Sequence, residues 1–265
     1  MRFTLDQLTQ PKTSKTESKV NGVSLGIWES PVNGQDIELI ALHRGNAKTG
    51  NMIQLSVVPV TWELEDGTEG RKAICGTCPH HKLGSCYAYD QGLFTMRKQG
   101  RKGAYKPMEM SEFLEFAKGA YIRFGRFGDL SLLPFEVVKK IADVAGGFTG
   151  YTNQWRSKHY DPRFNELFML STLGDKDAAE AKKKFPNARQ FQVIHEQADY
   201  TNDIKKGVIM CPSQNGYTCD ECLLCDGESA KGGAVNIQVR AHGLKYKTNR
   251  INKFLRSDLI DVKTI

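Results

Sequence analysis

The chain has 265 residues, of which 40 % are hydrophobic and 25 % are charged, and its formal net charge is +7. These values are those of an ordinary soluble globule, and no apolar stretch approaches the ~20 residues that span a bilayer, so the sequence excludes an integral membrane protein. The length suits one large domain or two small ones, and the positive charge favours an anionic partner, of which nucleic acid is the commonest.

A polar arm opens the chain. Residues 1–20 are rich in Thr, Ser and Lys and lack the apolar core of a secretion signal, which predicts a cytoplasmic protein with a flexible N-terminal arm and a single domain over residues 21–265. Residues 22–43 alternate apolar and polar side chains and predict a β-hairpin, and residues 52–60 predict a strand. The GNAKTG sequence between them lacks the full phosphate-binding loop pattern and precedes a strand, which excludes a nucleoside triphosphatase of that type.

Further along the chain, strand and helix patterns alternate. Helices are predicted at 111–118, 134–146 and 175–185, and strands at 119–125, 148–154, 167–173, 189–195, 206–211 and 234–241. Repeating strand–helix units imply a largely parallel sheet covered by helices, so the predicted fold class is α/β. Five or six units favour an open or partial (β/α) barrel, with cysteine-rich metal-binding loops, over a complete eightfold barrel.

The seven cysteines fall into two tight groups. The first group is Cys75, Cys78 and Cys86, and the second is Cys211, Cys219, Cys222 and Cys225. Such spacing lets several thiolates converge on one point, which is typical of metal sites. Disulfides fit less well, because the number of cysteines is odd, the chain is long enough to bury a core without covalent cross-links, and no secretion signal is present.

The second group favours an iron–sulfur cluster. The spacing Cys219-x2-Cys222-x2-Cys225 is the ferredoxin-like triplet, and Cys211, which precedes a proline, offers a fourth thiolate. Zinc ribbons more often use two separated C-x2-C pairs, so a [4Fe–4S] cluster is favoured and zinc is the alternative.

The first group has two interpretations, because it holds only three cysteines. Either His80 or His81 completes a closed Cys3His zinc site. Or the three thiolates hold a [4Fe–4S] cluster whose fourth iron is open to a substrate or to S-adenosylmethionine.

Polar side chains follow several predicted strands, at the edge where ligands of parallel α/β folds bind. We expect a catalytic set of Arg123, Asp129, Gln154 and His195, which faces the first cysteine group around one cavity. The second cysteine group is expected to be a closed site at the edge of that cavity. For Arg123 and Asp129 the alternative is a structural ion pair with a helix cap.

Basic residues gather in two stretches that also contain aromatic side chains. The first holds Arg97, Lys98, Arg101, Lys102, Tyr105 and Lys106, and the second holds Lys231, Arg240, Lys245, Tyr246, Lys247, Arg250, Lys253, Phe254 and Arg256. Because cations neutralise phosphates while aromatic rings stack on bases, the expected partner is nucleic acid or a nucleotide. A generally basic, solubilising surface is the alternative.

These motifs occur in a fixed order. GNAKT at 45–49 precedes the first cysteine group, RFGRFGD at 123–129 and GYTNQW at 150–155 follow, and the second cysteine group comes last. Over residues 43–242 this pattern resembles a group of uncharacterised bacteriophage proteins, which implies a phage origin and the cytoplasm of an infected host. The layout is more distantly similar to that of radical S-adenosylmethionine enzymes, although the C-x2-C-x7-C spacing departs from their C-x3-C-x2-C.

We therefore predict a phage-encoded iron–sulfur enzyme that acts on nucleic acid or a nucleotide, with nucleobase modification as the reaction. One alternative is a zinc-stabilised nucleic-acid-binding protein without catalysis. Another is an enzyme similar to base-exchanging transglycosylases, in which Asp129 is the candidate catalytic aspartate.

Overall fold

A computed structural model describes residues 22–43, 47–61, 67–88, 90–198, 207–228 and 235–261. The arm predicted at 1–20 lies outside the described residues, as do the first two residues of the GNAKTG sequence and Lys231 of the second basic stretch.

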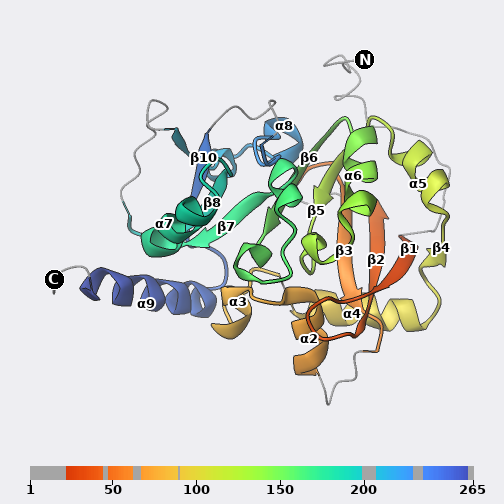
Figure 1. Ribbon diagram of the computed structural model, residues 1–265, viewed down its shortest axis with the longest axis horizontal. Helices are drawn as coiled ribbons and strands as arrows, with labels where there is room; N and C mark the ends of the chain where they lie inside the picture. Colours follow the sequence, from red (N-terminus) through yellow and green to blue (C-terminus); the bar gives the residue numbers. More distant parts are fainter. Residues whose placement is uncertain are drawn as a thin grey trace.

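The described residues form a ten-stranded sheet in the order β4-β1-β2-β3-β5-β6-β7-β8-β10-β9 (Figure 1). Its strands are β1 (Val23–Glu29), β2 (Asp36–His43), β3 (Ile53–Pro59), β4 (Lys106–Pro107), β5 (Tyr121–Phe124), β6 (Gly147–Thr152), β7 (Met169–Leu173), β8 (Gln190–Ile194), β9 (Val208–Met210) and β10 (Asn236–Arg240). Every strand predicted from the sequence is present, and β4 was not predicted.

Most neighbouring strands run parallel, and only β1–β2 and β2–β3 are antiparallel. The hairpin is antiparallel because its turn is short, and the turn is closed by a hydrogen bond from Ser30 N to Gln35 O (2.8 Å). From β3 through β8 each new strand except β4 adds beside the previous one, as repeated strand–helix units do, whereas β4 pairs with β1. The predicted α/β class with a largely parallel sheet is confirmed; the sheet is open, with β4 and β9 at its edges, and does not establish a barrel.

Eight α-helices lie in the described residues: α2 (Gly67–Cys75), α3 (Pro79–Lys82), α4 (Asp90–Arg101), α5 (Met110–Ala117), α6 (Phe135–Val144), α7 (Gly174–Lys184), α8 (Cys219–Cys222) and α9 (Lys245–Asp261). The three predicted helices correspond to α5, α6 and α7. Pro134 precedes the first residue of α6, and Gly146 N donates to Ala120 O just beyond its end (2.9 Å), so both sequence signals for its bounds hold.

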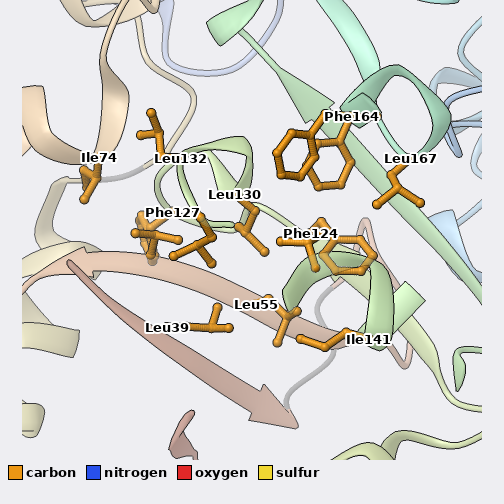
Figure 2. Packing of buried hydrophobic residues seen from close by; sticks show 14 of the residues in the cluster. Leu39, Leu55, Ile74, Phe124, Phe127, Leu130, Leu132, Ile141, Phe164 and Leu167 are labelled. Atoms are coloured by element: carbon orange, nitrogen blue, oxygen red, sulfur yellow. The ribbon is translucent and has the colours of Figure 1, made fainter. Parts of the chain in front are cut away.

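The main core lies between the sheet and the helices that cover it. Leu55 of β3 and Phe124 of β5 point toward Ile141 of α6 and Leu130, and Phe164 packs beside them (Figure 2). Since Phe124 faces this core, strand alternation turns its neighbour Arg123 to the other face of β5.

A smaller core holds α9 against the strands at the other end of the sheet. Ile251 and Leu255, four residues apart on one face of the helix, pack with Leu173 of β7, Val193 of β8 and Val239 of β10. This packing fixes the start of α9 near the carboxyl ends of the parallel strands, where the first cysteine group also lies.

Candidate metal centres

The first cysteine group forms one compact loop. Cys75 ends α2, Cys78 directly precedes α3, and Cys78 N donates to Cys75 O (3.0 Å). Burial raises the pKa of Cys78 to about 12, the nearby Cys86 thiol adds to the rise, and the backbone N–H groups of His81 and His80 oppose it. Burial also raises the pKa of Cys75, and the Cys78 and Cys86 thiols contribute. The three thiols are therefore half-buried and near enough to influence one another, and a metal bound by them stays a prediction.

Gln154 ties this loop to the end of β6. Its Nε2 donates to Cys75 O (2.8 Å), and its Oε1 accepts from Thr77 N (3.2 Å). The Thr77 hydroxyl donates to Asn153 O (3.0 Å), which makes a second tie to the same strand end. Gln154 is fully buried, so it positions the cysteine loop rather than facing a substrate.

Asp129 holds Gln154 in turn. Its carboxylate accepts five hydrogen bonds: Oδ1 accepts from Ser131 N (3.2 Å) and Ser131 Oγ (2.8 Å), and Oδ2 accepts from Thr152 Oγ1 (3.1 Å), Asn153 N (2.7 Å) and Gln154 Nε2 (3.3 Å). Burial raises the pKa of Asp129, and the hydrogen bonds from Asn153 and Ser131 oppose that rise. With its oxygens occupied by these donors, Asp129 acts as a hub for the loops after β5 and β6.

A cavity of about 180 Å³ lies beside the first cysteine group. Cys75 and Cys86 line it together with three cations, Arg71 of α2 and Lys247 and Arg250 of α9. None of the four predicted catalytic residues lines it. The prediction that they surround one cavity with these cysteines is wrong, because Asp129 and Gln154 lie buried behind the loop.

The second cysteine group surrounds a much smaller hollow of about 20 Å³, which all four of its cysteines line. Burial raises the pKa of Cys225, and the Cys211, Cys219 and Cys222 thiols add to this, while a hydrogen bond with Tyr151 opposes it. The four thiols therefore line one small hollow, and a metal bound by them stays a prediction.

This second group lies away from the first. Cys225 O accepts from Gly150 N of β6 (2.8 Å), and Cys219 N donates to Lys48 O (3.0 Å), in the segment that leads into β3. In Figure 1, α8 and α3, which mark the two groups, lie at opposite ends of the strands, α8 above them and α3 below. No residue of the second group lines the larger cavity, so its predicted place at the edge of that cavity is wrong.

Arg123 and His195 also lie apart from the first group. Arg123 is near enough to Cys219 and Tyr151 to lower the pKa of each against the rise that burial causes. Its Nε is buried and has no hydrogen-bond partner in the described residues. His195 follows β8, with Arg256 Nε 3.2 Å from its Nε2 and Gln197 N 3.1 Å from its Nδ1. The predicted set of four is thus divided among three places.

Arg189 fastens the second group and was not predicted. Its Nη1 donates to Asp226 Oδ1 (2.8 Å) and Gly227 O (2.7 Å), its Nη2 to Leu224 O (2.6 Å) and its Nε to Val235 O (2.9 Å). Both charged partners are buried. No sequence signal predicts that a single arginine before a strand holds a cysteine loop in this way. Arg71 did have a signal, because it lies four residues before Cys75 and therefore shares a helical face with that cysteine.

Both donor sets have the chemistry of sites for iron–sulfur clusters or zinc, since they consist of thiols. Within the described ranges, however, no three His, Cys, Asp or Glu side chains already have the arrangement that holds a metal ion. None of the described helices combines the length and apolarity needed to cross a bilayer. Comparisons with protein-family models, curated proteins and solved structures give no match to this chain.

Gly76 is the residue that lets Gln154 approach the cysteine loop. Its φ is +48°, and a Cβ there would collide with the Gln154 side chain. We expect Gly76→Ala to lower the free energy of unfolding by roughly 2–4 kcal/mol, from the left-handed backbone and the displaced amide together. Chemical denaturation measures this.

Gly119→Ala is the matched control, because Gly119 has φ +73° with nothing within 4 Å of the added carbon. The expected loss in the free energy of unfolding is therefore only about 1 kcal/mol. Equal costs would show that the Gln154 contact does not matter.

Proposed function

We propose that this chain is an iron–sulfur enzyme, of phage origin, that acts on nucleic acid or a nucleotide. Cys75, Cys78 and Cys86 would hold a [4Fe–4S] cluster that faces substrate, and the four cysteines of the second group would hold a closed site. The contrast between the two hollows supports this assignment, because about 180 Å³ adjoins the three-cysteine group and only about 20 Å³ lies among the four.

The surrounding residues suit these roles. When bound by three thiolates, a cubane cluster supplies an iron that is open to a fourth ligand. Gln154 and Asp129 fix the loop that carries the thiols, and the cations of the cavity favour an anionic reactant. S-adenosylmethionine is part of the proposal only as a co-substrate at that open iron, and the resemblance to radical enzymes is its sole support.

A zinc-stabilised nucleic-acid-binding protein is the second candidate, and His80 favours it. The ring is buried, lines the cavity and pairs its Nδ1 with Ser85 Oγ (3.0 Å), while burial lowers its pKa to about 4. A neutral imidazole held through one nitrogen is what a fourth zinc ligand requires. The transglycosylase-like alternative has no such support, because Asp129 does not line the cavity.

Metal analysis after anaerobic purification tests the proposal. We expect iron and acid-labile sulfide with the visible absorption of iron–sulfur clusters, and we expect Cys86→Ser to lose one cluster's iron while the fold persists. Cys225→Ser is expected to lose the other cluster and to destabilise the protein, since closed metal sites contribute directly to folding.

The contrary result is a colourless protein with stoichiometric zinc. In that case His80→Ala should release the zinc of the first group, and the binding-protein candidate replaces the enzyme.

A further inference from the structure

The cavity beside the first cysteine group contains a buried cation that the described carboxylates do not neutralise. Lys247 is only 7 % exposed, and its Nζ donates to Cys86 O (2.6 Å) and Ala88 O (3.4 Å). Carbonyl oxygens satisfy its hydrogen bonds but leave its charge in place, and a buried ammonium without a counter-charge is costly. This part of the cavity is therefore suited to an anion.

A second cation stands one turn further along α9. Arg250 is exposed, and its Nη1 donates to Gly84 O (2.9 Å), so it also meets the cysteine loop through a neutral acceptor. Arg71 adds a third cation from α2, and among the residues that the structure describes no aspartate or glutamate lines the cavity. A guanidinium beside an ammonium is a favourable pair for a phosphate group.

An aromatic ring adjoins these cations. Tyr246 lines the same cavity and is 53 % exposed, with Arg250 5.7 Å and Lys247 6.0 Å from its ring centroid. Rings next to phosphate-binding cations are typical of sites that stack a nucleobase.

We propose that this cavity binds one nucleotide unit, with the phosphate held by Lys247 and Arg250 and the base stacked on Tyr246. The inference deepens the proposed function and rests on it for its catalytic meaning, since it makes the substrate a phosphate-bearing nucleotide rather than a neutral nucleoside. The unit is either a free nucleoside monophosphate or one residue of a single strand. A paired base would first have to leave its duplex.

Binding measurements on the full chain, purified anaerobically and with its metal content determined, test this. The probes are inorganic phosphate, thymidine, thymidine monophosphate, and a fluorescent oligothymidylate offered single-stranded or as a duplex. We expect the monophosphate or the single strand to bind, and thymidine and the duplex to bind at least about tenfold more weakly, which corresponds to about 1.4 kcal/mol.

Variants of exposed residues locate the site without threatening the fold. Arg250→Gln and Tyr246→Leu should each weaken binding about tenfold, within the range measured for lost stacking or phosphate contacts. Lys253→Gln removes a charge from an exposed position of the same helix that does not line the cavity, so binding should change less than about twofold. Circular dichroism confirms that each variant is folded.

Three results would overturn the proposal: no binding of the monophosphate or the single strand, equal affinity in all four proteins, or a loss in Lys253→Gln as large as that in Arg250→Gln. The last would indicate a diffuse basic surface. Preference between monophosphate and single strand identifies the source of the unit. The result also separates the two claims. If a protein without iron binds the nucleotide at this site, the cavity assignment holds and the proposal of an iron–sulfur enzyme is wrong. If an iron-loaded protein binds neither the monophosphate nor the single strand, the cavity assignment is wrong and the iron–sulfur proposal holds.

Discussion

Arg189→Gln should lower the free energy of unfolding by roughly 3–5 kcal/mol, as measured by chemical denaturation. The guanidinium is 6 % exposed and the Asp226 carboxylate 3 %, so the substitution leaves a buried carboxylate without its cation. It also removes donors from the Leu224 and Gly227 carbonyls, on either side of Cys225. Because that loop carries the last thiol of the second group, metal retention at this group should fall with stability.

Arg163→Gln is the matched control for this substitution. Arg163 also pairs with carboxylates, Asp161 (2.7 Å) and Glu136 (2.5 Å), but its side chain is 56 % exposed. Solvent screens such pairs, so the expected loss is much smaller than that of Arg189→Gln. If Arg189→Gln proved as mild as Arg163→Gln, the idea that Arg189 fastens the cysteine loop would be wrong.

The parallel units were predictable because their signals are local. Alternation of apolar residues marked the hairpin and the strands, and Pro134 with Gly146 marked the ends of α6. Helix α9 was not predicted, because its buried face mixes Lys247, Thr248 and Asn252 with Ile251 and Leu255. A polar residue at a buried position weakens the helical period, and one of these polar residues, Lys247, lines the cavity.

The cysteine groups were predictable as groups, but their separation was not. Spacing shows which thiols converge, and it says nothing about where the loop of residues 211–225 returns. That position depends on backbone hydrogen bonds to Lys48 O and from Gly150 N, which leave no trace in the sequence. The direction of the Arg123 side chain was predictable, since a residue between buried Ile122 and Phe124 must face the opposite side of its strand.

Asp129→Ala should be the most damaging substitution near the first cysteine group, with a loss of at least about 3 kcal/mol in the free energy of unfolding. Two backbone N–H groups and the side chains of Ser131, Thr152 and Gln154 donate to this carboxylate, and each buried donor left without an acceptor costs about 1–3 kcal/mol, with partial relaxation. Asp129→Asn keeps one oxygen and the shape of the side chain, so its loss should be smaller. Asp143→Ala is the control, because that carboxylate is 56 % exposed and pairs only on the surface of α6.

A second measurement separates this positioning role from general destabilisation. Asp129 supports Gln154, and Gln154 holds the Cys75 carbonyl, so loss of the carboxylate should loosen the cysteine loop under conditions where the sheet stays folded. Alkylation followed by mass spectrometry should then show faster modification of Cys75 and Cys78 in Asp129→Ala than in Asp143→Ala, with Cys225 unchanged because it lines the separate, smaller hollow. Equal acceleration at all three cysteines would mean that the variant opens globally, and no acceleration would mean that the loop keeps its shape without the carboxylate. Either outcome contradicts the role of Asp129 as the residue that positions the first cysteine group.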